Sequence, residues 1–429
     1  MYRKMIWMAL IILLIAVPVL AQGGIDDEQR AKMMAVEQQV IALRELTPAE
    51  NIERLLVNET ELEGLVLSTL LSDYTVEQAH DEVLFYSTLG FMDRTVNLHQ
   101  ITEDVSTEQV AGFYDTKQDL MYVMMPNNEF DTLTSIIYAH EYTHALQDQN
   151  FDLESLISDE IFDAEPDRAL ANLALIEGDA QLMTLLYTQW LLENDPGAAA
   201  SMLAAMDLVE VSALEAAPDI IEAELIFPYD AGLRFTQTLY EENGWRILNK
   251  VYNRPPLSTE QILHPDLYLL YEEPQIVDLA PLDDFFVDDP SWTLMRSHAL
   301  GEFYISEHLK VRLPANEAQR AAAGWGGDRF DMYVNANEQV AVAWKLVWDT
   351  REDMDEFNIA YDVFAATWTG SQPEEFDNNI SCWWTATFTV CKAAAGEETI
   401  ISIAPTTEMT RDIIDFQLEH AVQEGFIFG

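Results

Sequence analysis

Basic residues are scarce in this sequence. Its 429 residues include 22 lysines and arginines against 75 aspartates and glutamates, for a formal net charge of −53. The electrostatic field of such a surface repels nucleic acid and anionic membranes, which disfavours functions that depend on binding phosphate groups. The charge is explained either by a solubilising surface on a secreted protein or by adaptation to high salt, where counterions screen the self-repulsion.

Cysteines are equally few. Cys382 and Cys391 are the only two, and in an exported protein such a pair indicates one structural disulfide. A continuous strand would hold these residues roughly 30 Å apart, at about 3.3 Å per residue, and would forbid the bond. A chain reversal near Ala386 and Thr387 would allow it, and we favour this hairpin over the continuous strand.

Long apolar runs are missing beyond the N-terminus, so no later segment is expected to span a membrane. Residues 1–21 have the pattern of an export signal, with a basic start, an apolar run and a small-residue cleavage site at Ala21. Pro18 and this site favour a cleaved signal over an uncleaved N-terminal anchor. We therefore expect a secreted or extracytoplasmic protein of the cell envelope, without stable membrane insertion after signal cleavage.

The most informative segment is the pentapeptide HEYTH at residues 140–144. It lies in TLTSIIYAHEYTHALQDQNFDL, whose hydrophobic period predicts an α-helix. Residues four apart on a helix rise by about 6 Å and point the same way, so His140 and His144 can hold one zinc ion. Glu141, beside the first histidine, can then accept a proton from a water activated there. The alternative is a surface helix with two hydrated histidines.

A second predicted helix, residues 167–194, is apolar nearly all round and is therefore expected to be buried. In its middle stand Glu177, Gly178 and Asp179, and acids in such a helix are costly unless they are paired or bound to metal. The glycine costs about 1 kcal/mol relative to alanine, which close helix packing would explain. We expect Glu177 to be the third zinc ligand, with a buried salt bridge as the alternative.

Segments on either side of these helices offer further parts of a site. Two strands are predicted at 111–114 and 120–125, and the edge of this hairpin can hold an extended peptide by strand addition. The alternative is an ordinary hairpin that packs on the helix. Downstream, Tyr229 and His264 are candidates to donate a hydrogen bond to an oxyanion, against simple packing or capping roles.

The HEYTH motif, followed about 33 residues later by EGDA, resembles the gluzincin metallopeptidases. These are zincins whose third ligand is a glutamate, and they include thermolysin-like, aminopeptidase-N-like and peptidase MA-like enzymes. The resemblance covers roughly residues 105–200. It implies His140 and His144 as zinc ligands, Glu141 as the catalytic base and Glu177 as the third ligand.

Two departures from these branches refine the expectation. The exopeptidase motif of the GAMEN type is missing, which argues against aminopeptidase activity. The thermolysin-like pattern has an aspartate where this chain has Gln181, so Asp179 or Asp148 is expected to be the partner of a ligand histidine instead.

The overall expectation is an α+β protein in two domains. Residues 22–285 would form a zincin-like metallopeptidase domain with a helical N-terminal segment, which we favour as part of the folded domain over a removable propeptide. Residues 286–429 would form a smaller α+β domain of unknown role. In it the pattern predicts helices at 300–309, 316–323, 353–366 and 409–422, and strands at 329–334, 340–348, 382–390 and 399–403.

The function predicted from the sequence is an exported zinc-dependent endopeptidase that hydrolyses a peptide or protein substrate. The alternative is a catalytically silent zincin-fold binding or scaffold protein of the cell envelope. A purely structural zinc is argued against, because structural sites usually have four protein ligands and only three are identified.

Salt adaptation predicts that thermal stability depends on ionic strength. The unfolding midpoint should rise between about 0.1 M and about 1 M NaCl, because the Debye length falls from about 10 Å to about 3 Å over this range. Thermal unfolding followed by circular dichroism measures the effect. A flat response rejects salt adaptation and favours the solubilising surface.

Overall fold

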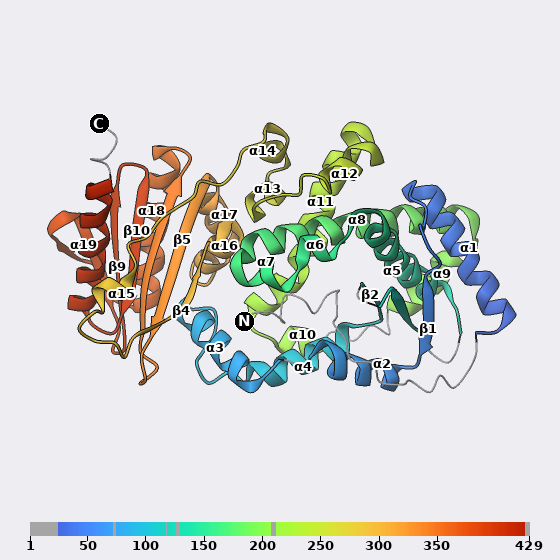
Figure 1. The fold of residues 1–429 in the computed structure, drawn as a ribbon, viewed down its shortest axis with the longest axis horizontal. Helices are drawn as coiled ribbons and strands as arrows, with labels where there is room; N and C mark the ends of the chain where they lie inside the picture. The colour runs from blue at the N-terminus through green and yellow to red at the C-terminus, as the bar shows by residue number, and fades with distance from the viewer. Residues whose placement is uncertain (1–24, 72–73, 117, 126–128, 207–211, 425–429) are drawn as a thin grey trace.

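The structure is a computed structural model and describes residues 25–71, 74–116, 118–125, 129–206 and 212–424 (Figure 1). The predicted export signal, residues 1–21, lies outside these ranges. The chain has an α+β fold with two separate sheets, one of three strands and one of seven. Of the helices in the described ranges, none is both long and apolar enough to cross a bilayer.

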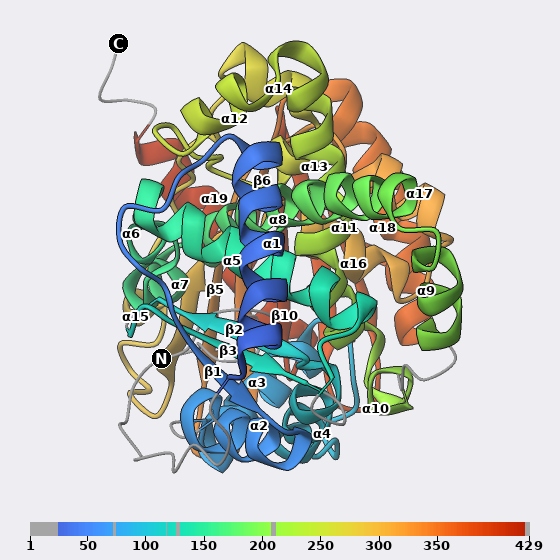
Figure 2. The same cartoon turned by 90° about the vertical axis from the view of Figure 1, so that its right-hand side faces the viewer.

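The first part of the chain is mostly helical and contains the three-stranded sheet (Figures 1 and 2). Its elements, in chain order, are α1 Asp27–Arg44, β1 Glu53–Val57, α2 Glu59–Leu65, the π-helix η2 Val66–Leu70, α3 Val76–Thr88, α4 Leu98–Gln109, β2 Gly112–Asp115, β3 Leu120–Met124, α5 Thr132–Phe151, α6 Glu154–Ile157, α7 Asp159–Ala164, α8 Pro166–Asn194, α9 Ala198–Met206, α10 Ser212–Ala216, α11 Asp219–Asn243, α12 Trp245–Val251, α13 Thr259–Leu263 and α14 Pro265–Leu270.

Side-chain caps explain where several helices begin. Asp26, Asn58 and Thr75 each accept a hydrogen bond from the backbone three residues later, where a glutamine or glutamate side chain returns one. These capping boxes satisfy backbone groups that a helix leaves unpaired at its start. The side chain of Asp131 caps α5, and Pro166 opens α8 with a backbone angle suited to the first helical turn.

The small sheet places an edge strand beside α5. Strand β1 pairs parallel with β3, and β2 pairs antiparallel with the other side of β3. The sheet order β1-β3-β2 therefore leaves β2 at the edge, in contact with α5. Strands β2 and β3 confirm the predicted hairpin. Strand β1 was not predicted, because its five residues lack the alternation of buried and exposed side chains that marks a strand.

The second part is a seven-stranded antiparallel sheet with helices on both faces. Along β6, Val342 and Trp344 join the core that includes α18, whereas Ala341 and Ala343 join the cluster with α15 and α19. Successive residues of a strand point to opposite faces, so the two helix layers sandwich the sheet. The elements are α15 Leu282–Phe285, β4 Thr293–His298, α16 Gly301–Lys310, α17 Ala315–Ala322, β5 Trp325–Val334, β6 Val340–Trp348, α18 Arg351–Thr369, β7 Glu374–Phe376, the 3-10 helix η4 Asp377–Asn379, β8 Ile380–Trp384, β9 Thr389–Ala395, β10 Glu398–Ala404 and α19 Thr407–Glu424.

Most predicted elements of this part are confirmed, including all four helices. The predicted strand at 382–390 is two strands, β8 and β9, with the chain reversal between them. Cys382 and Cys391 are direct partners in this hairpin and form a disulfide. Trp325 begins β5 directly after Gly324, which has a left-handed backbone with φ of +77°.

The two parts share one hydrophobic core rather than meeting across a linker. Phe85 of α3 packs against Phe330 of β5, with ring centroids 5.8 Å apart, and His308 of α16 contacts the backbone oxygen of Leu89 at 2.8 Å. The predicted boundary at residue 286 falls directly after α15. This helix packs on α19 through Phe285, so it belongs with the second part.

Helices α8 and α11 make the closest backbone approach in this region. A Cβ atom added to Gly178 would lie 2.1 Å from the carbonyl oxygen of Gly232, and one added to Gly232 would lie 2.1 Å from that of Ala174. The glycine in the middle of the buried helix is therefore explained by helix packing, as the sequence indicated. Because α11 lies so close to α8, its residue Tyr229 reaches Glu177, the neighbour of Gly178.

Substituting Gly178 with alanine should destabilise the fold, because the added methyl group overlaps the backbone of α11. Overpacking of this kind costs about 1–3 kcal/mol. The control is Gly64→Ala in α2, where an added Cβ meets nothing within 4 Å and alanine should be neutral or stabilising by up to about 1 kcal/mol. Urea unfolding of both variants measures the difference, and equal stabilities would contradict the close approach.

A second buried feature is the carboxyl group of Glu224 on α11. It accepts a hydrogen bond from the hydroxyl of Tyr86 at 2.7 Å and another from Tyr304. Burial raises the pKa of Glu224 from 4.5 to about 8, although both hydroxyl contacts act in the opposite direction. The group is therefore protonated at neutral pH in the folded protein.

This shift predicts that stability falls as pH rises. The folded protein holds the Glu224 proton more tightly than the unfolded chain, so its contribution is complete below pH 4.5 and is lost as pH rises through about 8. Denaturant midpoints measured from pH 5 to pH 9 should decline less steeply in Glu224→Gln than in wild type. The exposed Glu222→Gln on the same helix is the control and should keep the wild-type slope.

Candidate metal centre

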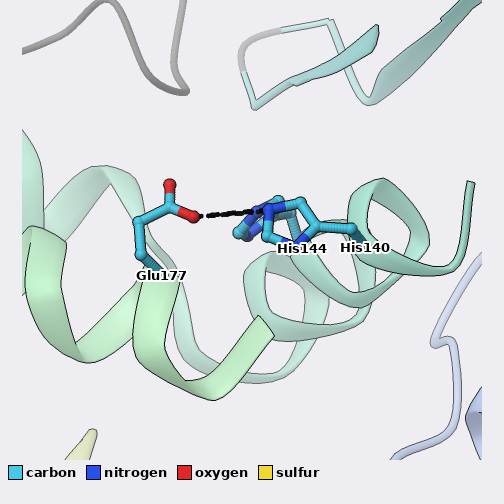
Figure 3. Close-up of side chains that lie close together, drawn as sticks. All are labelled: His140, His144 and Glu177. Carbon is cyan, nitrogen blue, oxygen red and sulfur yellow. Dashed lines mark hydrogen bonds and ion pairs between the residues drawn. The ribbon is translucent and has the colours of Figure 1, made fainter. Parts of the chain in front are cut away.

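Two helices bring three potential metal ligands together. Helix α5 carries His140 and His144, and α8 carries Glu177 (Figure 3). The two histidine Nε2 atoms are 3.0 Å apart. Oε2 of Glu177 lies 3.4 Å from Nε2 of His140 and 3.7 Å from Nε2 of His144. Among the described residues this is the one group of three such side chains whose ligand atoms converge within 4.8 Å.

The protonation state of the two histidines favours metal binding. Burial lowers the pKa of both histidines, so the imidazoles are neutral, which is the form that binds a metal. Burial raises the pKa of Glu177 well above its usual value, while a hydrogen bond with Tyr229 acts in the opposite direction. Two neutral imidazoles and a buried carboxyl group are the donor set of a catalytic zinc site, so the residues fit a zinc ion.

Hydrogen bonds orient both imidazoles. Nδ1 of His140 lies 3.2 Å from the hydroxyl of Thr184, which donates its own proton to the carbonyl of Ala180 and so accepts from the ring. Nδ1 of His144 lies 2.8 Å from Oε1 of Gln147. Each histidine therefore turns its Nε2 lone pair toward Glu177, as a metal ligand requires.

These partners differ from those expected from the sequence. Asp148 accepts hydrogen bonds from Tyr114 and from the backbone of Leu153, and Asp179 pairs with Arg44, so neither aspartate contacts a ligand histidine directly. Gln147 stands three residues after His144 on the same helical face, a spacing that could have identified it. The partnership between Thr184 and His140 joins two different helices and had no signal in the sequence.

Glu141 and Tyr229 complete the cluster. Glu141 is 7% exposed, and burial raises its pKa to about 7, with Glu177 acting in the same direction and His140 against it. The ring of Tyr229 stacks 6.2 Å from that of His140, and its hydroxyl interacts with Glu177. The structure thus brings a carboxyl group that can exchange protons and a phenolic donor beside the three ligands.

One side of this cluster faces a cavity of about 450 Å³. His140, Glu141 and Tyr229 line it together with Gln181 and with residues 109–112, which lead into β2. The start of the edge strand therefore borders the same cavity as His140. This arrangement can hold an extended chain against β2 with one of its backbone groups near the ligands.

His264 is not brought to this cluster. It lies between α13 and α14, with Nε2 2.9 Å from Oε1 of Glu302, whose hydrogen bond raises its pKa. It lines a different cavity of about 850 Å³ between α11, α13 and α16. Ser258 caps α13, and the chain after this cap places His264 against Glu302 of the second part of the molecule.

The comparisons with known proteins concern only the second part. A family model described as a domain of unknown function, DUF8575, matches residues 293–414. Neither the curated proteins nor the solved structures contain a significant match to the chain. The matched segment begins after all the candidate ligands, and its description assigns no activity.

Proposed function

We propose that the protein is an exported zinc-dependent endopeptidase with a zincin-like catalytic domain. The observation that carries this proposal is the convergence of His140, His144 and Glu177, with Glu141 and Tyr229 on the same cavity wall. A structural zinc site would have four protein ligands, whereas three ligands, of which His140 lines a cavity, are the arrangement of a catalytic site.

The role of each residue follows from its position. Zinc bound by the three ligands would supply a Lewis acid that acidifies a water molecule and polarises the substrate carbonyl. Glu141 accepts the proton of the attacking water and delivers it to the leaving amine, and its raised pKa suits both transfers. The hydroxyl of Tyr229 donates a hydrogen bond to the oxyanion that develops on the carbonyl.

The edge strand supports a polypeptide substrate. One side of β2 pairs with β3, and its other side has no strand partner in the described part of the chain. On that side the backbone N–H of Tyr114 hydrogen-bonds Glu141. An extended peptide can add ahead of Tyr114, along residues 109–112, which places its peptide bonds along the cavity. Recognition through the backbone along a strand suits cleavage within a chain and therefore favours an endopeptidase.

The disulfide supports export. Cys382 and Cys391 are bridged within a hairpin, and such bonds persist mainly in oxidising compartments. Together with the signal-like N-terminus, this favours a secreted or cell-envelope protein. The net charge of −53 makes nucleic acid an unsuitable partner.

The decisive experiment compares wild type with Glu141→Gln. The variant should retain one zinc per chain by elemental analysis but lose casein hydrolysis by at least about 100-fold, because the proton acceptor is gone. The control is Glu193→Gln, which removes an exposed carboxyl group at the far end of α8 and should keep full activity.

The other outcomes separate the alternatives. Undiminished hydrolysis by Glu141→Gln contradicts the mechanism. Zinc-loaded wild type that captures a protein partner and leaves it uncleaved favours the scaffold function. A wild type that binds no zinc rejects both the peptidase and the zinc-loaded scaffold.

A further inference from the structure

A buried chain of hydrogen bonds connects the N-terminal helix α1 to His144. Arg44, the last residue of α1, donates from Nε and Nη2 to the two carboxylate oxygens of Asp179, at 2.7 and 2.8 Å. Asp179 accepts a third hydrogen bond from the hydroxyl of Tyr252 at 2.7 Å. Nε2 of Gln147 lies 3.0 Å from that hydroxyl, and Oε1 of Gln147 lies 2.8 Å from Nδ1 of His144.

The direction of each hydrogen bond follows from groups in the chain that can only donate or can only accept a hydrogen bond. A guanidinium only donates, so Asp179 accepts, and the Tyr252 hydroxyl gives its proton to this carboxylate. The backbone oxygen of Ile176, which only accepts, lies 3.0 Å from Nε2 of Gln147. The amide nitrogen of Gln147 therefore faces Ile176 and Tyr252, and its oxygen faces His144. His144 must then carry its proton on Nδ1, which leaves Nε2 free for a metal.

The chain also ties the two ligand helices together. Gln147 and His144 lie on α5, whereas Ile176 directly precedes the ligand Glu177 on α8. One side chain, Gln147, thus contacts a ligand on the first helix and the backbone next to a ligand on the second. A displacement of Gln147 would therefore shift the histidines on α5 relative to Glu177 on α8.

Arg44 is held firmly at the start of this chain. It is fully buried, Nη1 donates to Asn249 at 2.8 Å, and the guanidinium lies 4.3 Å from the ring centroid of Trp245. Helix α1 packs across α5 and α8, as Figure 2 shows. Without α1, Asp179 would be a buried carboxylate without its cation, which is strongly destabilising.

We propose that Arg44 is a positioning residue for the metal centre, which sets the tautomer and orientation of His144 through Asp179, Tyr252 and Gln147. Helix α1, which supplies Arg44, then belongs to the folded catalytic domain and is not a removable propeptide. The inference deepens the proposed function and rests on it, because the ligand that is positioned is a ligand of the proposed zinc ion.

The first test is Tyr252→Phe in the full chain. This change removes the hydroxyl that links Gln147 to Asp179 and keeps the ring that stacks on Phe151 at 4.0 Å. The zinc dissociation constant, measured by titrating metal-free protein against a chelator, should rise by about 10- to 100-fold, as is usual when such a supporting contact is lost. The control is Tyr187→Phe, which removes a hydroxyl that links α8 to Ser135 of α5 outside this chain and should keep wild-type affinity.

The second test is Arg44→Lys, which keeps the charge but cannot bind both oxygens of Asp179 with a planar fork. It should weaken zinc binding, whereas Arg30→Lys on the exposed face of the same helix should not. Nitrogen-15 NMR of the metal-free protein gives a readout that does not depend on zinc or activity. His144 should be protonated on Nδ1 in wild type and should lose this single tautomer in Tyr252→Phe.

The outcomes distinguish this inference from the proposed function. Equal zinc affinities and an unchanged His144 tautomer in Tyr252→Phe and Tyr187→Phe overturn the positioning role and leave the peptidase proposal intact. Tight zinc binding that depends on Tyr252 in a protein without hydrolytic activity supports positioning and overturns the peptidase. A wild type without zinc affinity overturns both.

Discussion

The structure depends on how it accommodates two acids, Glu177 and Asp179, in the middle of one buried helix. Both are fully buried, and a charge left unpaired at such a position costs several kcal/mol. Asp179 is neutralised by a built-in cation, Arg44, which binds both of its oxygens. Glu177 instead faces two neutral imidazoles, and in the described part of the chain no lysine or arginine pairs with it. The protein thus supplies the counter-charge of Asp179 itself, whereas the proposed zinc ion would supply that of Glu177.

Helix α8 is therefore the element around which the centre is assembled. Gly178, between the two acids, lets α11 approach closely enough to bring Tyr229 to Glu177. On another side, α5 presents its two histidines, and α1 presents Arg44 to Asp179. Four helices thus bring to one place the candidate ligands, the residues proposed for proton transfer and oxyanion binding, and a support for one ligand. The small sheet adds the edge of β2, which borders the same cavity.

The second part of the molecule takes no direct part in this centre, yet it is not an independent appendage. Its sheet shares a core with α3 through Phe85 and Phe330, and its helix α16 forms one wall of the larger cavity with α11 and α13. The carboxyl group of Glu302 in that wall binds His264. The matched family segment, residues 293–414, thus packs directly against α11, the helix that holds Tyr229.

The sequence by itself determined whatever depends on neighbours along the chain. Helical spacing placed His140 and His144 on one face, and alternation with a reversal paired Cys382 with Cys391. Contacts between distant segments were decided only by the tertiary structure. Arg44 and Asp179 are 135 residues apart, and nothing in the local pattern of either segment marks the other. His264 likewise lies away from the centre, because periodicity constrains the local shape of a segment and not its position in the packed fold.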